Sequence, residues 1–269
     1  MKSLHRQEAK VVCVAGNSIE TPRLFLMSAS SMFPNGLANS SDQVGRNYMR
    51  HLTGSVYARF DKPVNFYRGE TMAGFLADEV KNNPKRGFVG GYYLETLALG
   101  PSFMGAFLEP GGWGKKFADM MDGYRNLAGM WIVGEDMPQA NNRITLGSAK
   151  DAFGLPAPNV HFDDHPNDTA MRNHAYNVGE KIYKSVGAKQ TWRTTPYPHT
   201  HNLGTMRMSA KKKDGVTNKW GRCHDIKNLF VSDGSVMTTG AACNPTLTIV
   251  ALAIRQGEYL ADQLKKGKI

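Results

Sequence analysis

Cysteine is scarce in this chain of 269 residues, and its three copies, Cys13, Cys223 and Cys243, stand far apart. Three scattered thiols form neither a disulfide framework nor a zinc knuckle, so we expect them to be reduced. No apolar run approaches the roughly 18 residues that a membrane-spanning helix needs. Residues 1–10 are polar and lack the apolar stretch of a signal peptide. A cytoplasmic location is therefore the default expectation, and export to the periplasm bound to a partner is the alternative.

The sequence also lacks the glycine-rich fingerprint G-x-G-x-x-G, which follows the first strand of dinucleotide-binding domains and holds a pyrophosphate at a helix N-terminus. Residues 10–16, Lys-Val-Val-Cys-Val-Ala-Gly, nevertheless predict a short strand that is buried on both faces. A helix should follow over residues 20–27, with Thr21 as its N-cap and Pro22 at its first position. We interpret this unit as a late part of a nucleotide-binding domain.

The composition, 41% hydrophobic and 21% charged, is typical of a globular protein. Part of the net charge of +10 lies in two lysine clusters, at residues 211–213 and 265–268. Short clusters of this kind are usually solvated, and the alternative partners are an acidic protein or a membrane surface. No basic stripe interleaved with aromatic residues is present, which argues against nucleic acid as a partner.

The remaining pattern predicts an antiparallel sheet, because residues 53–60 alternate between polar and apolar side chains. Asn141 and Asn142 are expected to form the turn between two strands at residues 130–138 and 143–146. A loop should cover residues 199–208, and a short strand residues 228–231. Three helices are predicted, at residues 114–127, 168–186 and 244–264. The last should bury an apolar face formed by Leu247, Val250, Ala251 and Ile254.

Four segments in order resemble the glucose-methanol-choline (GMC) oxidoreductases, over the C-terminal half of that family's pattern. They are Val11-Val12-Cys13-Val14-Ala15-Gly16-Asn17-Ser18-Ile19-Glu20-Thr21-Pro22-Arg23-Leu24 followed by Ser28; Val44-Gly45-Arg46-Asn47-Tyr48-Met49-Arg50-His51; His201-Asn202-Leu203-Gly204-Thr205-Met206-Arg207-Met208; and Asn228-Leu229-Phe230-Val231-Ser232-Asp233-Gly234-Ser235 with Asn244-Pro245-Thr246-Leu247-Thr248. The second and fourth segments resemble the family's Gly-Arg-Asn…His motif and its Asp-(Ala/Gly)-Ser strand end with the closing Asn-Pro helix. The third matches its His-x-x-Gly-Thr motif.

This resemblance implies an α+β or α/β fold with a partial, Rossmann-like FAD-binding domain and an antiparallel-sheet substrate-binding domain. Residues 1–50 and 191–269 would belong to the FAD domain, and residues 51–190 to the substrate domain. The closest similarity is to bacterial sugar dehydrogenases such as gluconate 2-dehydrogenase large subunits. The implied activity is FAD-dependent oxidation of the CH–OH group of an alcohol, sugar or sugar acid. The missing fingerprint has two explanations: a separate chain supplies the N-terminal half of the FAD domain, or the sequence is a fragment of a longer chain. An electron-acceptor protein is a further expected partner.

The resemblance also assigns roles to individual residues. His201 would be the catalytic base that faces the flavin N5, and Asn244 would bind the substrate oxygen. The cofactor would contact Ala15, Gly16, Asp233, Gly234, Asn244, Pro245 and Thr246. The residues alone support part of this, because histidine titrates near neutral pH and Gly204 would allow close approach to a flat ring. From spacing alone, His201 could equally be bonded within its loop, and His199 is its rival as the base.

Two other clusters contain residue types that occur in metal or catalytic sites. His161-Phe162-Asp163-Asp164-His165 has metal-ligand residue types, but Pro166 and loop-like flanks favour a solvated loop over a metal site. His224-Asp225 has the types of a base and its orienter, but no G-x-S-x-G serine elbow completes a triad, so we interpret it as a turn. The rival function is a non-catalytic remnant or interaction subunit that keeps the fold without binding FAD.

Overall fold

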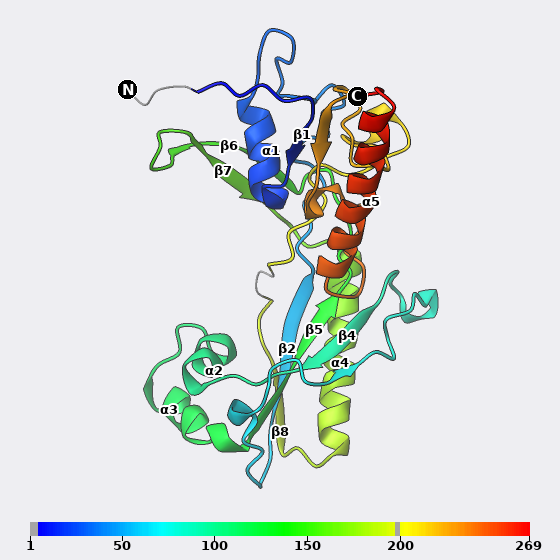
Figure 1. Ribbon diagram of the computed structural model, residues 1–269. Helices are drawn as coiled ribbons and strands as arrows, with labels where there is room; N and C mark the ends of the chain where they lie inside the picture. Colours follow the sequence, from blue (N-terminus) through cyan, green and yellow to red (C-terminus); the bar gives the residue numbers. More distant parts are fainter. Residues whose placement is uncertain (1–4, 197–199) are drawn as a thin grey trace.

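The computed structural model describes residues 5–196 and 200–269 and arranges them in two lobes joined at a narrow waist (Figure 1). The upper lobe contains β1 (Val12–Val14), α1 (Asn17–Met27), β6 (Arg143–Lys150), β7 (Pro156–His161), β9 (Leu229–Val231) and α5 (Thr246–Lys265). The lower lobe contains β2 (Leu52–Arg59), β3 (Phe75–Leu76), β4 (Tyr92–Thr96), α2 (Pro101–Leu108), α3 (Gly114–Asp122), β5 (Leu127–Gly134), α4 (Pro166–Ser185) and β8 (Gln190–Arg193). The expected mixed α/β fold with an antiparallel sheet is confirmed, and the domain boundaries at residues 50 and 190 stay a prediction.

The lower lobe is built on an antiparallel sheet with the strand order β3-β4-β5-β2-β8. The long helix α4 covers one face, where Val56, Tyr92 and Ile132 form a core with Met171 and Ala175. Because side chains alternate along a strand, the other face carries a different set. That set is more polar and more aromatic: Ser55, Tyr57, Tyr93, Glu95, Trp131 and Trp192.

The helices α2 and α3 pack over the far end of this second face, against Tyr57, Leu97 and Leu127. The sequence did not indicate α2, and the helix predicted at residues 114–127 ends at Asp122 before a single 3-10 turn. This turn is Tyr124–Asn126, and further 3-10 turns lie at Phe66–Arg68, Pro84–Arg86, Lys212–Asp214 and Gly234–Val236.

In the upper lobe, β1 pairs in parallel with β9, with Val12 opposite Leu229 and Val14 opposite Val231. The prediction that this strand is buried on both faces is wrong for the described residues, because Val12 is exposed. The predicted start of the following helix is also wrong. It begins at Asn17, whose side-chain Oδ1 accepts from the N–H groups of Ile19 and Glu20, and not at Thr21.

Pro22 therefore lies inside α1, where proline removes a helical hydrogen bond. The carbonyl four residues earlier, that of Ser18, is compensated by the hydroxyl of Thr205, which donates to it at 2.8 Å. Thr21 is not the N-cap that the sequence predicted. Its hydroxyl donates to Asp233 at 2.6 Å. The hydrogen bond between Thr205 and Ser18 thus connects α1 to the His-x-x-Gly-Thr segment, and Pro22 lies within the helix instead of starting it.

The turn expected at Asn141 and Asn142 is observed, since the N–H of Asn142 donates to the carbonyl of Gln139 at 3.1 Å, but the strands on its two sides do not pair with each other. The strand before them, β5, ends at Gly134 and belongs to the five-stranded sheet, whereas β6 pairs with β7 in a separate hairpin. This hairpin packs on α1, where Arg23 binds Asp151 at 2.6 Å and the carbonyl of Pro156 at 2.7 Å. The chain crosses the waist between β5 and β6, a long-range step that local periodicity does not reveal.

Candidate active site

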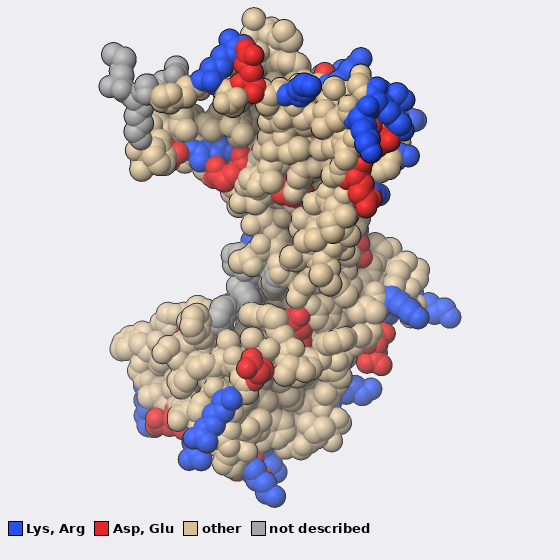
Figure 2. All heavy atoms as spheres, viewed as in Figure 1, with Lys and Arg blue, Asp and Glu red and all other residues tan. Residues whose placement is uncertain are grey.

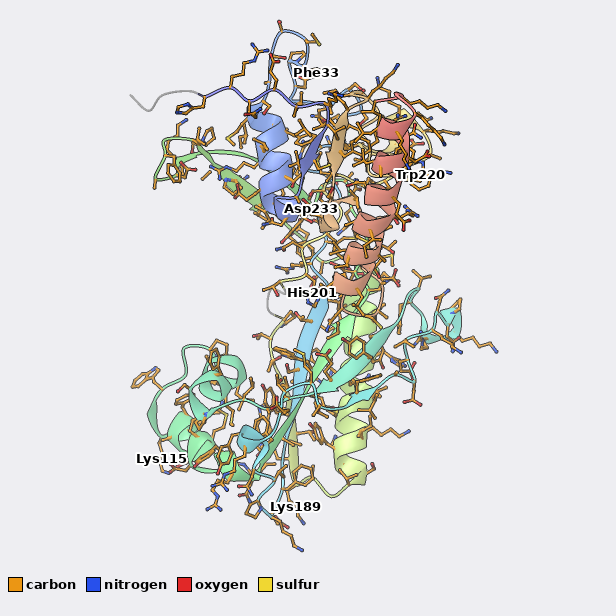
Figure 3. All side chains as sticks on the ribbon, in the orientation of Figure 1. Phe33, Lys115, Lys189, His201, Trp220 and Asp233 are labelled. Atoms are coloured by element: carbon orange, nitrogen blue, oxygen red, sulfur yellow. The ribbon has the colours of Figure 1, made fainter. Side chains whose placement is uncertain are left out.

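The waist brings together the four sequence segments that carry the family resemblance. Met49 and Leu203 exchange two backbone hydrogen bonds, of 3.0 and 2.9 Å, which join the second segment to the third. The third segment meets the fourth through the N–H of Met206, which donates to Ser235 at 2.8 Å. His201 lies at this waist, below Asp233 and above the five-stranded sheet (Figure 3).

His201 is held by a second histidine, His51, whose backbone adopts a left-handed conformation (φ 62°). Nδ1 of His201 lies 3.1 Å from Nδ1 of His51, and Nε2 of His51 lies 2.7 Å from the carbonyl oxygen of Gly240. A carbonyl only accepts, so neutral His51 carries its proton on Nε2 and accepts at Nδ1. His201 must then donate from Nδ1, which leaves the lone pair of its ring on Nε2. This chain of bonds sets the tautomer that a general base requires.

The surroundings of His201 favour its neutral form. Burial, with a contribution from His51, lowers the pKa of His201 from its ordinary 6.5 to about 4. Burial also lowers the pKa of His51, against a raising effect of its bond to Gly240. Both rings are therefore neutral near pH 7, and the basic nitrogen of His201 in this tautomer is Nε2.

Gly204 lies close to the neighbouring backbone, and its expected approach to a flat ring stays a prediction. Its φ is +93°, and a Cβ at this position would lie 2.1 Å from the carbonyl oxygen of Asn47. The glycine is therefore required where the third segment crosses the second, and the structure shows its close approach to backbone. The rival histidine, His199, lies outside the described residues.

Asn244 is not the N-cap of α5. The helix begins at Thr246, with Pro245 in the capping position, and no side chain caps its first turn. The amide Nδ2 of Asn244 instead donates to Oε1 of Glu95 at 3.3 Å, across the waist to β4. The exposed residues Asn244 and Thr246 thus flank an open helix N-terminus, which favours negative charge.

Asp233 binds protein groups with both carboxylate oxygens. Oδ2 accepts from the backbone N–H of Asn17 at 3.0 Å and from Thr21, and Oδ1 accepts from the N–H of Ser235 at 2.8 Å. A Cβ on Gly234 would lie 2.9 Å from Leu203. These two residues therefore clamp the turn after β1 to the turn after β9, and their proposed contacts with a cofactor stay a prediction.

Ala15 and Gly16 form the turn between β1 and α1. The N–H of Gly16 donates to the hydroxyl of Thr21 at 2.9 Å, and a Cβ on Gly16 would lie 3.2 Å from the same oxygen. Since Thr21 in turn binds Asp233, this turn is part of the same clamp.

Sequence reasoning missed several residues at the waist. His51 ends the second segment, yet nothing in the sequence places it against His201. Glu95 stands in a strand-like stretch and is only 5% exposed. Asp136 and Asp168 are also buried, and burial raises the pKa of Asp136 to about 6 and that of Asp168 to about 7. The sequence feature that could have identified them is a carboxylate just after an apolar strand, Asp136, together with a second carboxylate in the first turn of a helix, Asp168.

The clusters set aside in the sequence have other partners in the structure. His161 pairs with Asp163 at 3.0 Å on the surface, Asp164 binds Arg172 at 2.7 Å, and Nδ1 of His165 accepts from Asn167 at the start of α4. Within the described residues, no group of three or more metal-ligating side chains could hold a metal ion. Asp225 faces Ser40 and Lys212.

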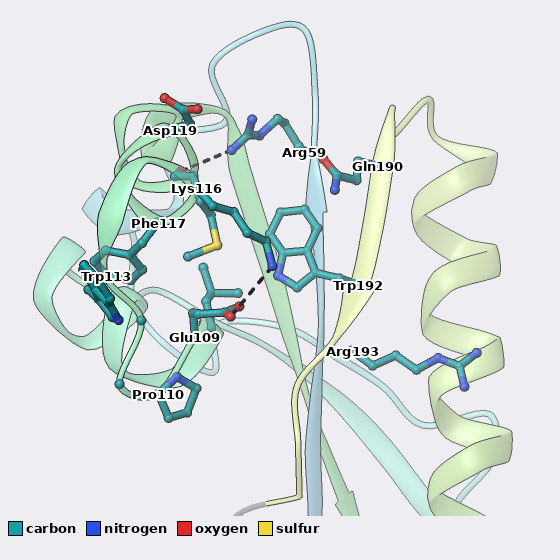
Figure 4. Close-up of a pocket in the computed structure, with 14 residues that line it drawn as sticks. Arg59, Glu109, Pro110, Trp113, Lys116, Phe117, Asp119, Gln190, Trp192 and Arg193 are labelled. Carbon is teal, nitrogen blue, oxygen red and sulfur yellow. Dashed lines mark hydrogen bonds and ion pairs between the residues drawn. The ribbon is translucent and has the colours of Figure 1, made fainter.

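A cavity of about 640 Å³ lies between the α2–α3 segment and the ends of β2 and β8 (Figure 4). Arg59, Trp113, Lys116 and Trp192 are among its lining residues, whereas His201 and Asn244 are not.

Basic side chains gather over the C-terminal end of α5 (Figure 2), where Lys266 pairs with Asp262. None of the helices within residues 5–196 and 200–269 has the length and apolar character needed to cross a membrane.

Comparison with known proteins finds relatives that match nearly the whole chain. The family model described as GMC oxidoreductase matches residues 138–253. The chain is 38% identical to 2-methyl-1,2-propanediol dehydrogenase from Mycolicibacterium austroafricanum over 96% of its length, and 32% identical to fructose dehydrogenase large subunit from Gluconobacter japonicus over 99%. It is 26% identical to gluconate 2-dehydrogenase flavoprotein from Pantoea cypripedii over 97%. It spans about half of these relatives, 49%, 50% and 46%.

Solved structures show the same fold. Pyridoxine 4-oxidase from Mesorbium loti matches with a TM-score of 0.62 at 16% identity, over 93% of this chain and 51% of the oxidase. A variant of formate oxidase from Aspergillus oryzae RIB40, studied for its FAD modification, matches with a TM-score of 0.62 at 17% identity, over 95% of this chain and 55% of that enzyme.

Proposed function

Because this chain belongs to the GMC oxidoreductase family and matches the C-terminal domain of its members, we propose that the whole protein oxidises a CH–OH group of an alcohol, sugar or sugar acid with FAD as its cofactor. The names of the relatives, which include a diol dehydrogenase and a fructose dehydrogenase subunit, support this reaction class. The observation that carries the proposal is the hydrogen-bond chain from Gly240 through His51 to His201, because it leaves a lone pair on Nε2 of a neutral histidine.

The residues at the waist fit the cofactor that the family implies. The first turn of α5 has no side-chain cap, so its backbone N–H groups can stabilise negative charge on a bound ring. When bound, FAD supplies the acceptor for the hydride that leaves the substrate carbon. In this proposal Ala15, Gly16, Asp233 and Gly234 form the wall of the cofactor site through their turns, and Asn244, Pro245 and Thr246 face it from the start of α5.

The chain's own residues would then handle the substrate oxygen. Nε2 of His201 takes the hydroxyl proton while the hydride leaves, which is general base catalysis. One N–H of the Asn244 amide donates to Glu95, so the second N–H can donate to the oxygen on which negative charge develops. The proposal requires two further components, a segment or chain that carries the glycine-rich turn and an electron acceptor.

The test is anaerobic stopped-flow reduction of the flavin in the full-length protein loaded with FAD. His201→Ala should slow reduction by about 10²- to 10⁴-fold, with a much smaller change in substrate affinity, because a general base acts in the transition state. His199→Ala is the matched control and should leave most of the rate. If His199→Ala abolishes reduction while His201→Ala does not, the base has been misassigned. A full-length protein that binds no flavin would instead support a non-catalytic interaction subunit.

A further inference from the structure

Glu95 is a buried carboxylate at the proposed substrate side of the sheet. It lies on β4, on the face opposite α4, and is only 5% exposed. Its cross-strand neighbour is Trp131 on β5, which in turn lies opposite Ser55 on β2. Because Asn244 reaches it from the start of α5, Glu95 stands where the sheet meets the helix and not in the core beneath α4.

The two oxygens of Glu95 have different surroundings. Oε1 accepts from the hydroxyl of Tyr93 at 2.5 Å and from Nδ2 of Asn244 at 3.3 Å. Burial, the bond to Glu95 and its charge raise the pKa of Tyr93, so the phenol stays protonated and donates. Oε2 accepts no hydrogen bond from the described residues. Oε2 is not among the fully buried side-chain atoms that lack a partner, so it keeps some contact with solvent. A carboxylate oxygen that is accessible and has no donor from the protein can accept from a ligand or from water.

We propose that Oε2 of Glu95 is a specificity-determining acceptor for a second hydroxyl of the substrate, next to the carbon that is oxidised. This inference rests on the proposed function and narrows its substrate class to neutral vicinal diols and polyols. A simple alcohol has no second hydroxyl and leaves Oε2 unpaired. A hydroxy acid places its own carboxylate near that of Glu95, and two like charges close together repel each other. Sugar acids, which the family resemblance included, are therefore disfavoured.

Three two-carbon alcohols isolate the group next to the reacting CH₂OH, because ethanol, ethylene glycol and glycolate carry a methyl, a hydroxymethyl and a carboxylate there. In the full-length FAD-loaded protein, kcat/KM should fall in the order ethylene glycol, ethanol, glycolate. Tyr93 and Asn244 both donate to Oε1, so in Glu95→Gln the amide oxygen takes that place and the NH2 group, which cannot accept, replaces Oε2. This variant should therefore reduce the preference for ethylene glycol over ethanol by about 10- to 100-fold. The same variant should raise the relative rate with glycolate. Glu109→Gln, a half-exposed glutamate at the end of α2, is the control and should change neither ratio.

Glu95→Asp keeps the charge but withdraws it by one methylene. It should lose the preference for ethylene glycol and still discriminate against glycolate, which remains informative if Glu95→Gln folds poorly. Equal losses with all three alcohols in both variants would overturn the inference, because a merely structural residue acts on every substrate alike.

Binding measured without turnover separates this inference from the proposed function. In a His201→Ala background, calorimetric titration with ethylene glycol should give a dissociation constant about tenfold or more below that for ethanol, and Glu95→Gln should abolish the difference. If flavin reduction fails with every alcohol yet this binding preference is present, the proposed function is wrong and the role of Glu95 stands. If reduction proceeds and the preference is absent from both assays, the role of Glu95 is wrong.

Discussion

At the scale of single residues, the site depends on contacts between side chains that are far apart in sequence. The motif pattern identified His201 and Asn244, but their partners, His51 and Glu95, come from another segment and another strand. His51 stood at the end of a quoted segment without a role. Glu95 could not be chosen among the strand residues until the sheet order showed which face α4 leaves uncovered. The sequence therefore predicts the residue that acts in the reaction more readily than the residue that orients it.

The low pKa of His201 predicts the pH dependence of the reaction. The base acts only when neutral, and its pKa of about 4 keeps it neutral over the range in which an ordinary histidine would gain a proton. The rate constant for flavin reduction in the full-length protein should therefore stay level from about pH 8 down to about pH 5, and fall as the pH drops through about 4. A stopped-flow pH series checks this. A limb near 6.5 that disappears in the His201→Ala variant would show that burial does not act on this histidine in the enzyme.

At the scale of secondary structure, isolated elements followed from the sequence better than their pairings. The helix predicted at residues 168–186 is observed at 166–185, and that predicted at 244–264 is observed at 246–265. Both have long stretches with helical periodicity. β7 escaped prediction because it contains two prolines, Pro156 and Pro158, which normally argue against a strand. β8 is short, and only its partner β2 defines it.

The junction between β5 and α4 contains two buried carboxylates whose cost depends on pH. Asp168 accepts from the N–H of Met137 at 3.1 Å, just beyond Asp136. Burial, with repulsion from Asp136, raises the pKa of Asp168 from 3.8 to about 7. Because the folded state holds this proton more tightly than the unfolded state does, the stabilisation is complete below about pH 4 and is lost as the pH rises through about 7.

Asp168→Asn should remove this dependence, since an amide keeps an acceptor for Met137 and carries no charge. We expect the melting temperature of the full-length protein at pH 8 to rise by a few degrees, corresponding to roughly 1–2 kcal/mol. The difference between variant and wild type should vanish near pH 4. Thermal melts at pH 4, 6 and 8 measure this, with the exposed Asp163→Asn as the control. A constant difference between the two proteins at all three pH values would contradict the assigned ionisation.

At the scale of the whole molecule, the described chain leaves apolar surface uncovered. The apolar face predicted for α5 exists, but it is not buried within the described residues, because Leu247 is 85% exposed and Ile254 is 60% exposed. In the same lobe, strand β1 exposes Val12. A contiguous exposed apolar face commonly marks an interface. Since the chain spans about half of its relatives, the remaining half of the FAD domain is the cover that we propose for this surface.

The chain of 269 residues on its own should therefore self-associate and fail to retain FAD. Water contact with the α5 face favours association, and the absent glycine-rich turn removes the group that normally holds the pyrophosphate. Gel filtration with light scattering and absorbance at flavin wavelengths measures both properties.

Leu247→Lys combined with Ile254→Lys should shift the chain alone toward monomer, because the charges oppose burial of this face. The matched exposed pair on the β6–β7 loop, Leu155→Lys combined with Phe153→Lys, should not have this effect. In the full-length protein the α5 substitutions should instead lower FAD occupancy, since there the same face lies in the interior. A chain that is monomeric, melts cooperatively and elutes with one FAD per molecule would show that the surface needs no cover and that the cofactor site is complete within these residues.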